Sequence, residues 1–165
     1  MATNFPSGLK APFFEGGTDG GNGVFPNAGK TFYVDSANGS DGNDGTTTDK
    51  AVATLAQAHS LVTTNKGDVI YLLPGHSETY ASAAAISLTK SGFSVIGIGT
   101  GTRRPVFYAI TATTATFAIS GSNVTFKNVK FDGATHASGI DAVAVMVDVT
   151  AGDGHVFDGC YFVQS

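Results

Sequence analysis

A repeat in the second half of the chain constrains the fold most strongly, because apolar residues recur there every 31 positions. Each repeat reads as a short strand, a tight turn of Gly, Ser or Asp, and further short strands. The matching residues are Val95 with Phe126, Ile98 with Val129, Phe126 with Phe157, Val129 with Cys160, and Phe131 with Phe162. Strands this short cannot bury a face alone, so the period predicts a stacked solenoid. An antiparallel sandwich, the alternative, does not predict matched positions at a constant period.

The composition favours an all-β fold and excludes several classes of protein. Of 165 residues, 22 are Gly, 42% are apolar and 13% are charged, and the net charge is −4. Binding to nucleic acid needs a surplus of Lys and Arg to neutralise phosphates, so we expect no nucleic-acid partner. No apolar run approaches the ~20 residues of a membrane span. The first residues do not read as a secretory signal, and we expect no membrane insertion.

We therefore expect a right-handed parallel β-helix over residues 31–165, closed at its N-terminal end by one short helix. This helix is expected at about 50–64, with Thr48 or Asp49 as its N-cap. Its apolar face, at spacings of three and four, contains Val52, Leu55, Ala56, His59 and Val62. A later strand is expected to turn alternate residues toward the core, namely Val143, Val145, Val147 and Val149.

Residues 1–30 differ from the rest and are expected to form an extended attachment arm. The glycines between positions 16 and 23 disfavour both a helix and a flat strand. The arm nevertheless carries four aromatic residues, Phe5, Phe13, Phe14 and Phe25. These side chains pack either on the arm's own domain or on a neighbouring subunit, and the sequence leaves both open.

The other end of the chain lacks an evident cap. Residues 155–165 read as the start of a new coil, with no polar or helical segment after them. Terminal repeats of solenoids normally need a cap. We expect either that a partner chain covers this end or that the native polypeptide continues past Ser165.

Three segments resemble the opening of pectate-lyase-like right-handed β-helix proteins. They are residues 32–45 (FYVDSANGSDGNDG), 53–58 (ATLAQA) and 67–75 (GDVIYLLPG). The resemblance implies that the helix caps the first coil and that the third segment is the first full strand. The family usually has Pro-Phe before the helix, where this chain has Ala51 and Val52. Polysaccharide lyases, glycoside hydrolases, adhesins and phage virion proteins share this fold, so the resemblance specifies fold better than function.

The Phe-, Pro- and Gly-rich arm also resembles the leaders of phage structural proteins, in which the leader attaches to the particle and the β-helix projects. Our hypothesis is a bacteriophage virion protein that is not an enzyme. It would be a decoration or fibre-type subunit on the capsid surface, with the tail as a second location. The expected partners are the major capsid or tail protein and further copies of the chain, for instance in a trimer.

The alternative hypothesis is a tailspike-like domain that binds or cleaves a host-surface polysaccharide; a secreted adhesin is disfavoured by the missing signal. A lyase of this fold needs a basic residue near the sugar, and Arg103 is the candidate. Residues that could stack on sugar rings are Tyr71, Tyr80, Tyr108 and Tyr161. A glycosidase needs two facing carboxylates, and Asp132, Asp148 and Asp158 could approach one another from different coils. However, Asp132 and Asp158 stand in Asp-Gly turns. We predict no catalytic residues, and name Tyr71, Tyr108 and Arg103 as candidate saccharide contacts.

One acidic loop is a candidate calcium site. Its oxygen-bearing side chains are Asp35, Asp41, Asn43 and Asp44. The loop lacks the spacing and the bidentate Glu of an EF-hand, so the interpretation we favour is a set of turns stabilised by Asp and Asn. The four histidines show no metal-ligand spacing, and Cys160 reads as a small core residue. We therefore expect no cofactor.

Overall fold

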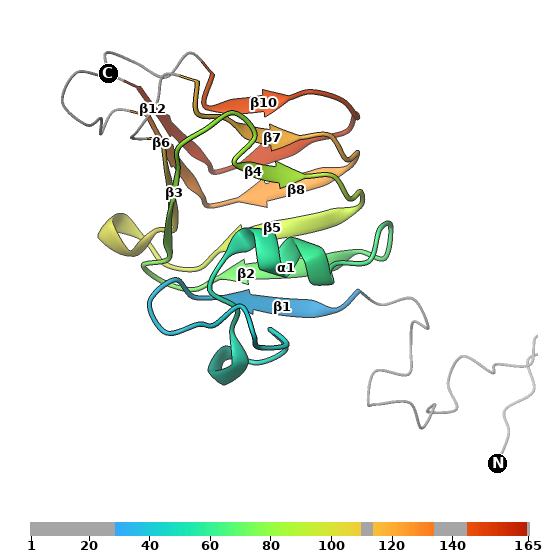
Figure 1. Cartoon of the computed structure of the whole chain (residues 1–165), viewed down its shortest axis with the longest axis vertical. Helices are drawn as coiled ribbons and strands as arrows, with labels where there is room; N and C mark the ends of the chain where they lie inside the picture. The colour runs from blue at the N-terminus through green and yellow to red at the C-terminus, as the bar shows by residue number, and fades with distance from the viewer. Residues whose placement is uncertain (1–28, 110–113, 134–144, 165) are drawn as a thin grey trace, which may run out of the picture.

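The computed structural model describes residues 29–109, 114–133 and 145–164, which form a parallel β-helix of three sheets (Figure 1). Sheet A contains, in order, β1 (Thr31–Val34), β2 (Asp68–Leu72), β5 (Phe93–Gly97), β8 (Val124–Lys127) and β11 (Val156–Asp158). Sheet B contains β3 (Ser77–Tyr80), β6 (Val106–Ala109), β9 (Lys130–Asp132) and β12 (Tyr161–Val163). Sheet C contains β4 (Ile86–Leu88), β7 (Phe117–Ile119) and β10 (Val147–Val149). All neighbouring strands in these sheets pair in parallel.

The strand register confirms the repeat. Phe157 pairs with Phe126, and Phe162 pairs with Phe131, each 31 positions apart. Because matched apolar residues lie directly beside one another in successive coils, the interior is a set of stacked columns. The prediction of a parallel β-helix is confirmed, and the antiparallel sandwich is excluded.

The corners between the sheets differ in length from coil to coil. Between sheets A and B the chain uses residues 73–76 after β2, 98–105 after β5 and 128–129 after β8. The longest of these corners includes a short 3-10 helix, η2 (Gly101–Arg103). The strands on either side keep their parallel pairing, so corner length does not disturb the sheets.

Hydrogen bonds between coils hold the corners in place. The Ser91 hydroxyl oxygen accepts the backbone N–H of Ser122 at 2.9 Å, and the Ser122 hydroxyl oxygen accepts that of Asp153 at 3.3 Å. At the next corner, Asn128 has a left-handed backbone (φ 56°), which Asn adopts more readily than most residues. Its side-chain amide donates to the carbonyl of Gly97 at 2.8 Å. Polar corner residues therefore tie each coil to its neighbour.

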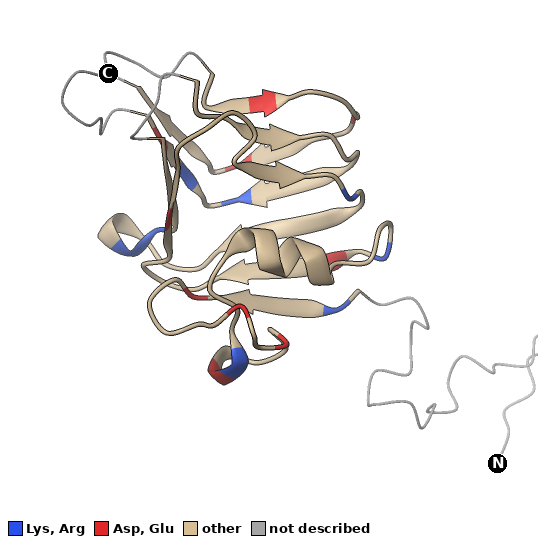
Figure 2. Cartoon of the chain, viewed as in Figure 1, with Lys and Arg blue, Asp and Glu red and all other residues tan. Residues whose placement is uncertain are grey.

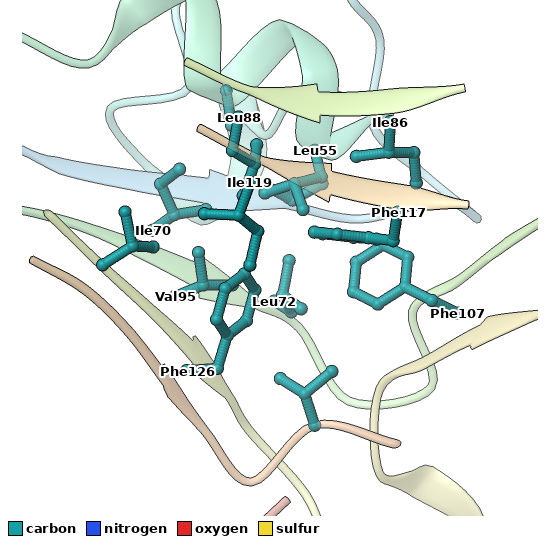
Figure 3. Close-up of a cluster of buried hydrophobic side chains, with 14 of the residues drawn as sticks. Leu55, Ile70, Leu72, Ile86, Leu88, Val95, Phe107, Phe117, Ile119 and Phe126 are labelled. Atoms are coloured by element: carbon teal, nitrogen blue, oxygen red, sulfur yellow. The ribbon is translucent and has the colours of Figure 1, made fainter. Parts of the chain in front are cut away.

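Apolar side chains from the three sheets and the helix meet in one core (Figure 3). Phe107, Phe117 and Phe131 lie at ring-centroid distances of 5.1 to 5.8 Å from one another, mostly edge to face. Burying a Phe side chain stabilises a fold by about 1.5–3 kcal/mol, and edge-to-face pairs add to this. The aromatic column therefore contributes a large part of the core.

The capping helix is shorter than predicted. α1 spans Leu55–Leu61, because Val52 pairs with Val34 of β1 in an isolated bridge and cannot join the helix. Ala58, rather than Ala56, is the alanine that faces the core. No helix in the described ranges is long and apolar enough to cross a membrane.

The N-cap of this helix is Thr54. Its hydroxyl oxygen accepts the N–H of Gln57 at 3.1 Å. The prediction of Thr48 or Asp49 is wrong, since both belong to the separate 3-10 turn η1 (Thr48–Lys50). Thr54 and Gln57 stand at the spacing of a capping box, a sequence signal that the broader helical pattern obscured.

A buried carboxylate anchors the cap to the first coil. Asp68 opens β2 and is almost fully buried. Its two oxygens accept the backbone N–H groups of Lys30 and Thr63, each at 2.6 Å. Asp68 therefore joins the segment that enters β1 to the segment that leaves α1.

Candidate functional site

A group of charged and aromatic side chains lies on the outer face of sheet B, and we call it the sheet B patch. Its members are Arg104, Tyr108, Lys130 and Tyr161, together with Asp132, which is on the same face of the sheet but only 4% exposed. The Arg104 guanidinium carbon lies 3.8 Å from the centre of the Tyr161 ring, in a cation–π contact. The Lys130 ammonium nitrogen lies 2.6 Å from a carboxylate oxygen of Asp132. Tyr108 pairs with Asp132 across β6 and β9, which places its side chain in the same patch.

The patch contains only some of the predicted saccharide contacts. Tyr108 and Tyr161 lie in it. Arg103 is exposed in η2, and its carbonyl accepts the N–H of Gly75 at 2.8 Å. Arg104 is the arginine that contacts an aromatic ring, and sequence reasoning missed it. The available signal was its position directly before Pro105 and β6, which sets it beside the strand rather than in the turn.

The other two candidate tyrosines lie elsewhere. Tyr71 is on the outer face of sheet A, where its ring stacks on Tyr33 with centroids 5.8 Å apart. Tyr80 points into the core and donates a hydrogen bond to the carbonyl of Met146 at 3.1 Å. Burial, aided by the negative charge of Asp132, raises the pKa of Tyr80 to about 12. The four tyrosines therefore do not form one stacking surface.

The three carboxylates considered for glycosidase chemistry lie on three different sheets. Asp132 is on sheet B, Asp148 on sheet C and Asp158 on sheet A. Asp158 forms an exposed ion pair with Lys127 at 2.8 Å. The structure does not bring these carboxylates together across one groove.

Hydrogen bonds within the protein engage the candidate calcium loop. Asp41 accepts the N–H groups of Ala53 and Thr54 at 2.9 Å each, and so holds the loop against the cap. The Asn43 amide donates to the carbonyl of Ala51 at 2.8 Å. These bonds match the turn-stabilising interpretation of the loop. Within residues 29–109, 114–133 and 145–164, no three His, Cys, Asp or Glu side chains are grouped to hold a metal ion.

Asp35 and Asp44 of this loop accept local hydrogen bonds. Burial acts to raise the pKa of Asp35, but hydrogen bonds from the side chain of Asn38 and from nearby backbone N–H groups outweigh it and lower that pKa. The backbone N–H and the hydroxyl of Thr46 lower the pKa of Asp44. Both carboxylates therefore remain charged and serve the turns around them.

Two histidines, His59 in α1 and His76 after β2, accept backbone hydrogen bonds that link separate segments of the chain. The His59 Nε2 atom accepts the N–H groups of Thr89 and Lys90 at 3.2 and 3.1 Å, which requires an unprotonated nitrogen. Burial, and then the charge of Lys90, lowers the pKa of His59 to about 4. In His76, Nδ1 accepts the N–H of Ser36 at 3.1 Å, and Nε2 lies 2.9 Å from a carboxylate oxygen of Glu78.

Cys160 lies beside the core of the last coil and is partly buried. Burial raises the pKa of its thiol, which keeps it protonated and poorly nucleophilic. This placement agrees with the prediction of a small core residue.

The last coil leaves an apolar surface, which we call the open end. Its inward-pointing side chains Val149 and Phe162 are 46% and 49% exposed, whereas the exposed Val156 and Tyr161 point outward from sheets A and B. Val149 pairs with the fully buried Ile119 and so points inward, yet it is exposed because no described coil covers it. The prediction that four alternating valines of this segment all face the core is therefore only partly right. Val147 packs on the core, Val145 is exposed, and Val143 lies outside the described residues.

The predicted attachment residues Phe5, Phe13, Phe14 and Phe25 also lie outside the described residues. Charged side chains in the described part are spread thinly over the coils rather than gathered on one face (Figure 2). The open end and the sheet B patch are therefore the two surfaces that stand out chemically.

Comparison with known proteins supports the fold. No protein-family model matches the chain, and no curated protein does. Among solved structures, a rhamnogalacturonan lyase aligns with a TM-score of 0.52 and 21% sequence identity. The alignment covers 81% of this chain and 51% of the lyase, so the chain spans about half the length of that structure. This similarity agrees with the pectate-lyase-like β-helix and concerns the fold alone.

Proposed function

We propose that this chain is a structural subunit of a bacteriophage virion and not an enzyme. The N-terminal arm docks the subunit on neighbouring capsid or tail proteins, and the β-helix projects as a decoration or fibre. Copies of the chain associate with one another. A trimer, in which flat faces of three β-helices pack side by side, remains a prediction.

The observation that carries this proposal is the apolar open end. Two inward-pointing apolar side chains of the last coil, Val149 and Phe162, are about half exposed, in strands that have only one neighbour each among the described residues. Contiguous apolar surface and free strand edges favour association with other protein. In a subunit of a larger assembly, such a surface would be buried against a neighbouring protein.

The polar side chains give further support, because many of them hold the fold. Asp41 and Asp68 accept pairs of backbone N–H groups, and His59 does the same through one nitrogen. Chemistry on a polysaccharide needs carboxylates or bases that face a substrate, and these groups face the protein.

The proposal can be tested on virus particles. Phage carrying the full-length chain with Phe13→Ser and Phe14→Ser should lose the protein from purified particles, seen by quantitative immunoblotting and by cryo-electron microscopy of the capsid and tail. The matched control is Tyr71→Ser, which removes an aromatic ring from the side of the β-helix. Unchanged incorporation of the arm variant, or no signal on any particle, would contradict the proposal.

A second candidate function is the binding of a host-surface polysaccharide, and the sheet B patch favours it. A cation over an aromatic ring, next to an ion pair, suits a sugar that bears hydroxyl and carboxylate groups. Incubation with acidic and neutral capsular polysaccharides tests it. Binding that is lost with Arg104→Ala but kept with Tyr71→Ala would support this candidate. New reducing ends or unsaturated products would establish cleavage and overturn the non-enzymatic proposal.

A further inference from the structure

We propose that α1 is an acid-sensitive lid over the first coils of the β-helix. Its N-terminal end stays fastened to neighbouring segments, whereas its C-terminal end is held closed by hydrogen bonds that form only while the His59 imidazole is uncharged. Acid should therefore open one end of the helix while the strands beneath it stay paired. The lid goes beyond the proposed function and does not depend on it.

Carboxylates fasten the N-terminal end of the lid. The backbone N–H of Leu55, the first residue of α1, donates to a carboxylate oxygen of Glu78 at 2.5 Å. One carboxylate oxygen of Asp41 accepts the N–H groups of Ala53 and Thr54 at 2.9 Å each. Since neither contact involves an imidazole, this end of the helix can serve as the hinge.

His59 fastens the C-terminal end of the lid to the turn after β4. Its Nε2 atom accepts the N–H groups of Thr89 and Lys90 at 3.2 and 3.1 Å. A nitrogen that accepts two N–H groups must keep its lone pair, so this contact requires the neutral imidazole. A proton on Nε2 would set one N–H against two others, and both hydrogen bonds would be lost.

The groups around His59 oppose its protonation in the closed lid. Lys90 is the charged group that acts on the imidazole, and its ammonium donates to two carbonyls at the end of the helix at 2.6 Å each. The Phe93 ring of β5 lies 5.7 Å from the imidazole, and Asp68 of β2 is engaged by two backbone N–H groups. Burial and then Lys90 lower the pKa of His59 to about 4, and no carboxylate of the described residues offsets them.

The other buried imidazole of this end, His76, has different neighbours. Its Nδ1 atom accepts the N–H of Ser36 at 3.1 Å, and its Nε2 atom lies 2.9 Å from a carboxylate oxygen of Glu78. Asp35 is close enough to interact with its charge, and the ring of Phe107 lies 5.9 Å away. A proton on His76 would gain attraction to carboxylates, whereas a proton on His59 would face a cation. His59 is therefore the acid-sensitive group of the pair.

The lid covers apolar surface. Leu55, Ala58 and Val62 of the helix and its C-cap are buried, and they belong to the same apolar cluster as Ile70 and Leu88 (Figure 3). The strands below α1 are held by their own parallel ladders, so they do not need the helix to stay paired. Movement of the C-terminal end of α1 would thus expose part of the core without dissolving the sheets.

Hydrogen exchange of the full-length chain at pH 7.5 and pH 5, expressed as protection factors, tests the lid. The His59 contact is complete above pH 6.5, the ordinary pKa that the open lid would restore, and is lost as the pH falls toward 4. The open fraction should therefore rise about 30-fold between the two pH values. The N–H groups of Val62 and Thr89 should lose protection by this factor. Leu55 at the hinge and Val95 in sheet A should keep theirs.

His59→Gln is the test variant, because glutamine keeps an acceptor oxygen but does not titrate. It should remove most of the pH response at Val62. His76→Gln is the matched control at the other buried imidazole, and it should keep that response. The inference would be overturned by equal loss of protection in sheet A, by unchanged protection of Val62 between the two pH values, or by the same response in His59→Gln.

A second measurement needs no variant. Binding of an apolar fluorescent dye to the unmodified chain should rise reversibly between pH 7.5 and pH 5, while the far-ultraviolet circular dichroism keeps its β signal. Constant dye binding, or a rise that accompanies loss of the β signal, would overturn the lid. Neither experiment involves virus particles, so failure of the lid would leave the proposed function in place, and loss of the particle association would leave the lid in place.

Discussion

The first and the last described coils of this β-helix are built alike but are covered differently. At the N-terminal end, α1 covers the core, Asp68 ties the cap to the first strand, and His59 fastens it to the turn after β4. At the C-terminal end, inward-pointing residues such as Val149 and Phe162 are half exposed. A coil in a solenoid is stable through its neighbours, so an identical residue should matter much more at the closed end than at the open end. The following predictions test this difference, from the largest effect to the smallest.

The largest effect should come from the aromatic column that runs between the ends. Phe131→Ala removes a fully buried ring and should lower the free energy of unfolding by about 3–5 kcal/mol. Phe162→Ala removes its neighbour in the next coil, which is half exposed, and should cost about 1 kcal/mol. Urea denaturation of both variants gives the comparison. Equal costs would mean that another chain buries the open end in solution.

Asp68→Ala should be the most destabilising polar substitution at the closed end. It leaves the backbone N–H groups of Lys30 and Thr63 without their carboxylate, and we expect a loss of about 3 kcal/mol. Asp153→Ala, at an exposed turn of the last coil, is the control and should change stability by less than about 0.5 kcal/mol. Thermal unfolding should give a lower melting temperature for Asp68→Ala than for Asp153→Ala. The reverse order would refute the anchoring role of Asp68.

Acid should loosen the closed end through His59. Its folded pKa of about 4 lies below the ordinary value of 6.5, so the unfolded chain binds the proton more readily. The stability from neutral His59 is therefore complete above pH 6.5 and is lost as the pH falls toward 4. Between pH 7.5 and pH 5 this single group should remove about 2 kcal/mol.

His59→Gln provides the comparison, because glutamine keeps an acceptor atom but does not titrate. Its denaturation free energies over the same pH range should show a shallower slope than those of the unmodified chain. Hydrogen exchange should locate the acid-sensitive amides at Thr89 and Lys90, whose N–H groups the imidazole accepts. An unchanged slope would assign the acid sensitivity to other groups.

The smallest effect should come from the N-cap of α1. Thr54→Ala removes the acceptor for the Gln57 N–H and should cost about 1 kcal/mol. Thr54→Ser keeps the hydroxyl and should restore most of the loss, as measured by thermal unfolding. If alanine and serine behave alike, the cap hydrogen bond adds nothing beyond the packing of the helix.

The sequence predicted the coils well because their period is carried by side chains that must stack. Phe126 and Phe157 could be matched by position alone, since parallel strands in register keep a constant spacing. The helix boundary was harder to predict. Val52 fits a helical face by spacing, but its contact with Val34 depends on a strand distant in the sequence.

The surfaces were only partly predictable. Tyr108 was named from the sequence as a candidate saccharide contact, which remains a prediction, whereas Arg104 was not named, because its contact with Tyr161 joins residues two coils apart. The acids were correctly read as turn formers at Asp41, whose partners Ala53 and Thr54 lie across a loop. The sequence led us to expect that a partner chain or further polypeptide covers the last coil, and this remains a prediction. Which side chains it exposes could be read only after the strand register was known.

The unequal corners between sheets A and B have a practical consequence. The same corner spans residues 73–76, 98–105 or 128–129 without any change in strand pairing, so the number of residues there is independent of the rest of the coil. A foreign peptide inserted beside Thr102, at the exposed tip of the longest corner, would be presented sideways from a rigid stack. The molecule is therefore a ready scaffold for display, in which several corners on one side could carry different sequences at spacings set by the sheet.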